Sequence, residues 1–187
     1  MTATAVPGYR VEGHAIISAD DRIAGADGTT PPALNNAADW ARFQAALDQS
    51  ALVVLGRISH EANPNRRDRP RLVISSSAAG IEKRADAWWW NPARASLADA
   101  FRTAAPKGGL VAVPGGRLVF DLFLAIGFDA FHLSRSADTW LPDGVPIFTD
   151  VANGRTADQV LARHGMVPDP AEPLDRAAGV TLTVWRR

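Results

Sequence analysis

Short runs of apolar residues alternate along the chain with segments whose apolar residues recur at helical spacing. The runs that predict buried strands lie at 11–18, 51–55, 71–75, 87–90, 110–113, 130–134 and 180–185. Predicted helices begin after Asn36 and Gly116, and others cover 57–62, 96–104 and 156–163. In the first of them Trp40, Phe43 and Leu47 repeat at i, i+3 and i+7 and form one apolar stripe. This alternation predicts an α/β fold with three layers, α/β/α, around a mostly parallel sheet with an antiparallel C-terminal strand.

Three turns that directly follow predicted strands are rich in glycine or serine. They are Gly56-Arg57, the serine run at 75–77 and Pro-Gly-Gly at 114–116. Ligands of parallel sheets bind at the carboxyl ends of the strands, where glycines admit a ligand to the backbone and helix-terminal N–H groups meet phosphate. Each turn alone also fits ordinary turn chemistry, and Arg57 alone fits a surface arginine. Together the three turns indicate an extended, phosphate-bearing cofactor.

Composition narrows the classes of function. The 187 residues fit one domain spanning 1–187, and 20 basic residues against 20 acidic ones leave no net field to hold nucleic acid or an anionic membrane. The absence of cysteine excludes disulfides, thiolate nucleophiles and cysteine-ligated zinc. No run of eighteen uncharged apolar residues occurs, so we expect a cytoplasmic protein. The dinucleotide fingerprint G-x-G-x-x-G and the P-loop are both absent.

Ionisable residues offer one informative candidate. The four histidines, at 14, 60, 132 and 164, show no metal-ligand spacing, so we expect no metal. Ser59, His60 and Glu61 offer a nucleophile and a base, but adjacent positions do not face one another on a helix, so we discount hydrolysis. Asp39 lies in the first turn of the helix after Asn36. It is either a surface acid at the favourable end of the helix dipole or a buried acid with a raised pKa that binds or protonates a heterocycle.

The order of these features resembles the dihydrofolate reductase family from about residue 11 to residue 150, with the closing strand also in register. The matching pieces are AIISADDRIAG, NNAADWARF, VVLGRISHE, RPRLVISSS, AVPGGRLVF, FHLS and TLTVWRR. The resemblance extends more loosely to the riboflavin-pathway pyrimidine reductases, which are similar in fold but have no acid in this helix. It implies a dihydrofolate reductase-like fold and NADPH as the cofactor.

The resemblance also implies roles for individual residues. Asp39 matches the family's pocket acid, which hydrogen-bonds the pterin and favours its protonation. The implied substrate contacts are Ile17, Leu34, Trp40, Phe43, Pro114 and Ser134, with Arg69 at the anionic tail. The implied NADPH contacts are Ala24, Gly56, Arg57, Ile58, Ser59, Ser75, Ser76, Gly115, Gly116, Arg117, Leu118, Val119 and Phe120. Ser76 matches a contact to the 2′-phosphate, and the family has a cis peptide where Gly115 meets Gly116.

Two departures bear on the substrate. Leu34 stands where the family has a tryptophan, so a water-mediated contact to the pterin is missing, and segment 61–68 is short and polar where the family is apolar. A polar wall suits dihydromethanopterin, whose aryl ring bears a sugar chain instead of glutamate.

We therefore expect an NADPH-dependent reductase of dihydromethanopterin or dihydrofolate, with only small-molecule partners, as a monomer or homodimer. The alternatives are a reductase of a ribosylaminopyrimidine phosphate and an NADPH-binding protein without turnover. The tryptophan run at 88–90 is expected to be structural, and the role of the Pro-rich region 141–179 stays open.

Overall fold

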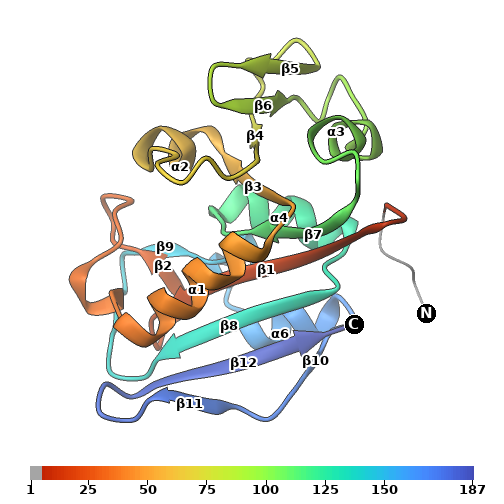
Figure 1. Ribbon diagram of the computed structural model, residues 1–187. Coiled ribbons are helices and arrows are strands. Elements are labelled where there is room, and N and C mark those ends of the chain that lie inside the picture. The colour runs from red at the N-terminus through yellow and green to blue at the C-terminus, as the bar shows by residue number, and fades with distance from the viewer. Residues whose placement is uncertain (1–5) are drawn as a thin grey trace.

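A ten-stranded sheet runs through the centre of the computed structural model, which describes residues 6–187 (Figure 1). Its strands follow in the order β10 (Val167–Pro168), β12 (Val180–Arg186), β8 (Ala130–Ser136), β1 (Tyr9–Ile17), β7 (Gly109–Val113), β3 (Leu52–Gly56), β4 (Arg71–Ile74), β6 (Ala87–Trp90) and β5 (Ile81–Arg84), and β11 (Glu172–Asp175) also pairs with β12. All neighbours from β8 to β6 are parallel, whereas β12 pairs antiparallel with β8. The predicted mostly parallel sheet with an antiparallel C-terminal strand is confirmed.

Helices cover both faces of this sheet (Figure 1). They are α1 (Ala37–Gln49), α2 (Arg57–Ala62), α3 (Leu97–Ala104), α4 (Arg117–Ile126), α5 (Thr149–Ala152) and α6 (Ala157–Arg163). In Figure 1, α1 crosses in front of the sheet, and α4 and α6 lie behind it. A 3₁₀ turn, η1 (Pro32–Leu34), and a small sheet of β2 (Arg22–Ala24) and β9 (Val145–Pro146) complete the fold. The expected helices at 57–62, 96–104 and 156–163 are all present, the last with a capping box between Thr156 and Gln159.

The larger apolar core is rich in phenylalanine. The rings of Phe120, Phe128 and Phe148 pack around Phe131 with centroids 5.1 to 5.6 Å from its own, and all four are almost completely buried. Burial of each such side chain contributes about 1.5–3 kcal/mol. Gly13 of β1 makes room for this cluster, because a Cβ at that position would lie 2.3 Å from the Phe131 ring.

A smaller apolar core lies beneath the C-terminal half of α1. Leu47 packs there with Val53, Leu55 and Val73, and Phe43 lies at its margin. Trp40 does not join it, since 60% of its surface is exposed. Of the predicted stripe, only Phe43 and Leu47 therefore contact this core. The N-terminal half of α1 therefore faces different neighbours, which are described below.

The tryptophan run is structural, as expected. Trp89 belongs to the smaller core and Trp90 to the larger one, which follows from the alternation of side chains along β6. The indole of Trp90 donates to the carbonyl of Ala95, and the guanidinium of Arg84 stacks 4.0 Å from the Trp89 ring centroid.

Candidate active site

The three turns singled out in the sequence lie along one edge of the sheet. Strands β7, β3 and β4 are parallel neighbours, so the turns that follow their carboxyl ends are neighbours too. A Cβ on Gly56 would lie 3.4 Å from Val119 of α4, and one on Gly116 would lie 3.9 Å from the Ser59 hydroxyl of α2. The turns at Gly56 and Gly116 therefore meet each other across the edge.

The turn before α4 depends on glycine. Gly115 and Gly116 have φ of 111° and 56°, and a Cβ on Gly115 would lie 2.8 Å from the Phe120 ring. Every peptide bond within residues 6–187 is trans, so the cis peptide expected between these two glycines is wrong. The positive φ angles reverse the chain in its place.

Helices α2 and α4 both begin at this edge without a side-chain cap. Their first-turn N–H groups have no partner within the helix and are the kind of donor that binds phosphate. Two large apolar side chains flank these helix starts in solvent, Ile58 at 75% exposure and Leu118 at 72%. Solvent-exposed apolar groups of this size beside free N–H groups suit a ligand that has both rings and phosphates.

The remaining predicted cofactor residues divide into surface and core. Arg57 is exposed and pairs with Glu61 at 3.0 Å, Ser76 is exposed, and the Ser75 hydroxyl bonds that of Ser77. The Nε atom of Arg117 is buried without a partner. The side chains of Ala24, Val119 and Phe120 are buried, the last two in the larger core, so Val119 and Phe120 shape this edge from below.

Asp39 is a partly buried acid and not the cap of its helix. The cap is Asn36, whose side-chain oxygen accepts from the N–H groups of Ala38 and Asp39, while its amide donates to Asp175 of β11. Burial raises the pKa of Asp39, and the Ser134 hydroxyl and the charge of Arg42 offset part of that rise. The Ser134 hydroxyl is buried and forms no hydrogen bond of standard geometry, so it acts on Asp39 by proximity. Asp39 is thus less exposed than a surface acid and has a raised pKa.

The other predicted substrate residues differ in accessibility. Ile17, Leu34 and Ser134 are almost completely buried, while Pro114 and Phe43 are partly buried. The Trp40 ring is exposed and tilts against Phe43 at 5.7 Å. Asp39 and Phe43 on α1 and Ser134 on β8 are brought together between helix and sheet.

Arg69, the predicted clamp for the substrate tail, is already paired. Its Nε and Nη2 atoms donate to Asp48 at 2.8 and 2.6 Å, and Nη2 also donates to the Gln44 side chain at 2.7 Å. Both partners lie on α1. A substrate carboxylate would have to displace Asp48 to bind this arginine.

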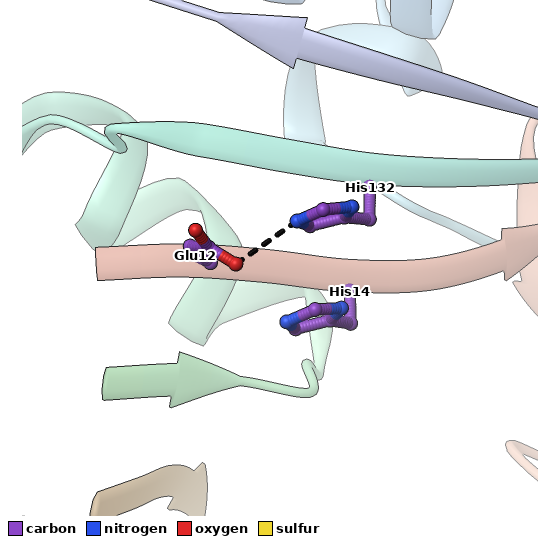
Figure 2. A group of neighbouring side chains, drawn as sticks. All are labelled: Glu12, His14 and His132. Atoms are coloured by element: carbon purple, nitrogen blue, oxygen red, sulfur yellow. Dashed lines mark hydrogen bonds and ion pairs between the residues drawn. The ribbon is translucent and has the colours of Figure 1, made fainter. Parts of the chain in front are cut away.

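Sequence spacing missed a group of ionisable residues beneath α1. His14 on β1 and His132 on β8 stack with centroids 4.6 Å apart and planes 2° apart, and Glu12 accepts from His132 at 3.0 Å (Figure 2). Arg42 of α1 contacts the other nitrogen of His132. Spacing along the sequence does not reveal this pair, because strand pairing joins residues 118 positions apart.

Neither of two surface cavities includes this region. One of about 400 Å³ lies by Arg71 and Trp88, and another of about 380 Å³ lies by Asp121 and His164. Both are open depressions whose linings include neither Asp39 nor the glycine turns. Within residues 6–187 no helix has the length and apolar composition needed to cross a membrane.

Comparisons with known proteins identify the fold. No protein-family model matches the sequence, and neither does any curated protein. Solved structures do match: a pyrimidine reductase-like protein from Corynebacterium diphtheriae has a TM-score of 0.69 at 12% identity, with 100% of this chain and 94% of that chain covered. Dihydrofolate reductase from Enterococcus faecalis, complexed with NADP(H), has 0.65 at 16% identity, with 95% and 96% covered. A riboflavin biosynthesis protein from Shewanella sp. PV-4 has 0.63 at 17% identity, with 95% and 98% covered. The chain has the dihydrofolate reductase-like fold.

Proposed function

We propose that this protein is an NADPH-dependent reductase that transfers a hydride to C6 of a dihydropterin while N5 receives a proton. The observation that carries the proposal is the position of Asp39. This half-buried acid with a raised pKa lies beside Ser134 near the carboxyl ends of β1 and β8. The neighbouring strand β7 ends in the Pro-Gly-Gly turn, so substrate and cofactor could meet between them.

The residues of the sheet edge fit a dinucleotide. The uncapped start of α4, with positive φ at Gly115 and Gly116, leaves N–H donors and open backbone where a pyrophosphate would lie. Arg57 and the serines at 75 and 76 would hold the adenosine phosphates, and Ile58 and Leu118 would cover the rings. NADPH would supply the hydride, and the protein's contribution is to place both rings and exclude water.

Asp39 supports the reaction on the substrate side. As a carboxylate it accepts hydrogen bonds from the amino and ring N–H groups of a pterin, and its raised pKa lets it favour a protonated ring at a pH where an exposed aspartate would not. Ile17 and Pro114 would flank the ring, and Phe43 with Trp40 would contact the aryl group. The engagement of Arg69 with Asp48 favours dihydromethanopterin, which has no glutamate next to the aryl ring, over dihydrofolate.

A second candidate is reduction of a ribosylaminopyrimidine phosphate. It is favoured by the same engagement of Arg69 and by two of the structural neighbours, which are described as a pyrimidine reductase-like protein and a riboflavin biosynthesis protein. In that case Asp39 would contact a pyrimidine, and the sheet edge would still hold NADPH. An NADPH-binding protein without turnover is the third possibility.

The deciding experiment is NADPH oxidation, followed by absorbance, with dihydromethanopterin, dihydrofolate and the ribosylaminopyrimidine phosphate offered separately to the full chain. We expect turnover with dihydromethanopterin above that with dihydrofolate. Turnover of the pyrimidine alone would replace the proposal with the second candidate. NADPH binding without oxidation by any of the three would support the binding protein.

Asp39→Asn tests the assigned residue directly. It should lower kcat at least about 100-fold, the low end of what a positioned acid contributes, and leave the Kd for NADPH unchanged. Asp169→Asn is the matched control, because Asp169 pairs with Arg186 on the surface beside the outermost strand β10. Equal kcat in the Asp39→Asn variant and the wild type would remove Asp39 from the mechanism.

A further inference from the structure

A polar layer lies where the N-terminal half of α1 crosses β1 and β8. We define it as Glu12, His14, His132 and Arg42. These polar residues fill the contact between helix and sheet, whereas the contact beneath the C-terminal half of α1 is apolar. The Glu12 and His132 side chains are only 12% and 14% exposed, and His14 is 3% exposed. Charged groups so buried need partners, and the partners here form one chain.

The direction of each hydrogen bond in that chain follows from the donors present. Arg42 can only donate, so Nδ1 of His132 accepts from it. The proton of His132 is therefore on Nε2, from which it is donated to the Glu12 carboxylate at 3.0 Å. The chain runs from the Arg42 cation through a neutral imidazole to the Glu12 carboxylate, whose other oxygen accepts from Arg10 of the same strand at 2.7 Å.

The same proton argues against a metal ion among Glu12, His14 and His132, although their ligand atoms lie within 4.8 Å of one another (Figure 2). Nε2 of His132 carries hydrogen as long as Arg42 donates to Nδ1. The lone pairs of His14 and His132 also lie in two parallel ring planes and cannot both point at one ion. His14 instead supports the ring of His132 as an uncharged stacking partner.

Arg42 has a second acid within range. It follows Asp39 by three positions, a spacing at which side chains on a helix meet, and the charges of the two residues act on each other. Other groups that face this region are Glu172 of β11 and the Ser134 hydroxyl of β8. Even so, Asp39 makes no ion pair with any cation in residues 6–187. The Arg42 guanidinium is turned to the sheet instead, toward His132.

We propose that Glu12 and His132 are positioning residues that hold the Arg42 guanidinium against the sheet, so that Asp39 keeps no cationic partner and remains able to take up a proton. This rests on the proposed function for its catalytic meaning, because a free acid matters only if a substrate ring lies against it. The restraint on Arg42 itself does not depend on any substrate.

The test is a carboxyl ¹³C NMR titration of Asp39 without substrate in the wild type and in Glu12→Gln. The variant keeps the shape of the side chain but replaces the anion by a neutral amide, a weaker acceptor that loosens the hold on His132 and Arg42. Released, Arg42 should turn to Asp39 and lower the pKa of Asp39 by about 1 pH unit or more, the usual effect of a cation within 4–6 Å. His132→Leu breaks the same chain at its middle and should give the same downward shift.

Two controls separate release of Arg42 from loss of a nearby negative charge. Glu172→Gln removes an exposed carboxylate that also acts on Arg42 but does not contact His132, so it should give less than half the shift. In an Arg42→Met background, Glu12→Gln should leave the pKa of Asp39 nearly unchanged. Equal shifts from Glu12→Gln and Glu172→Gln, or a full shift in the absence of Arg42, would overturn the proposal.

A measurement on the wild type covers the case in which the variants do not fold. ¹⁵N chemical shifts should show His132 as the neutral Nε2–H tautomer at pH 7, and the Nδ1–H tautomer would overturn the chain.

Failure of the proposed function can be distinguished from failure of this positioning chain. If the variants shift the pKa of Asp39 but no dihydropterin is reduced, the positioning chain stands and the function falls, whereas turnover with an unshifted pKa rejects the chain alone.

Discussion

Acid should destabilise this protein through His14, and replacing that residue should remove most of the effect. His14 is 3% exposed, neither ring nitrogen has a hydrogen-bond partner, and burial lowers its pKa from 6.5 to about 3. Between those two values the unfolded chain binds a proton at this site and the native protein does not. The free energy of unfolding therefore falls as the pH falls below 6.5, by about 3 kcal/mol at pH 4.5. That is a large part of the 5–15 kcal/mol typical of a domain.

The assay is urea unfolding followed by tryptophan fluorescence at pH 7.5, 6.5, 5.5 and 4.5. Stopping at pH 4.5 leaves out most of the loss due to Glu12, which runs from the ordinary pKa of 4.5 down to its native pKa of about 2. His14→Leu should flatten the pH dependence and, at pH 7.5, gain roughly 1–3 kcal/mol from the deletion of unsatisfied polar atoms. The exposed His164 provides the control variant His164→Leu, which should retain the slope. The same slope in His14→Leu as in the wild type would refute the reasoning, and lower stability at pH 7.5 would show that the ring has a partner.

Three further substitutions test other parts of the structure. Gly115→Ala should lower the free energy of unfolding by at least about 2 kcal/mol, measured by urea unfolding, because of its φ of 111° and the nearby Phe120 ring. Asp21→Asn should lower it by about 3 kcal/mol, because buried Asp21 accepts from Arg135 and from a backbone N–H; a loss below 1 kcal/mol would contradict the value of that pair. Ser76→Glu should raise the KM for NADPH about tenfold and leave that for NADH within about twofold, since a carboxylate would repel a 2′-phosphate; equal changes would remove Ser76 from that contact.

Much of the sheet was predictable because its strands are continuous apolar runs. Parallel strands that are covered on both faces need apolar side chains on both sides, so runs such as 52–55 and 71–74 stand out from their surroundings. The turns that close these runs then follow from their glycine and serine residues, and the sheet order brings them to one edge. Strand β5 was not predictable, because IEKR has one apolar residue and lies at the edge of the sheet, where charged side chains are usual.

The polar layer was not predictable for a different reason. Glu12 and His14 interrupt the apolar run of β1 on one face, and nothing local indicates that His132 will lie beside them. The stripe on α1 was misjudged at Trp40 for a related reason, since helical spacing shows which residues share a face but not how far the sheet extends beneath it. Pairings between distant strands have no signature in a single sequence.

The polar layer and the candidate acid belong to one arrangement. If β1 and β8 presented apolar side chains to this part of α1, as the strands beneath its C-terminal half do, Arg42 would have no polar partner on the sheet. It would then pair with Asp39, because an unpaired buried cation is far more costly than a helical ion pair. The pair would fix Asp39 as a carboxylate and occupy the oxygens that a substrate ring needs. By supplying Glu12 and His132 to Arg42, the sheet leaves Asp39 without an ion-pair partner, as its proposed role in binding and protonating a heterocycle requires.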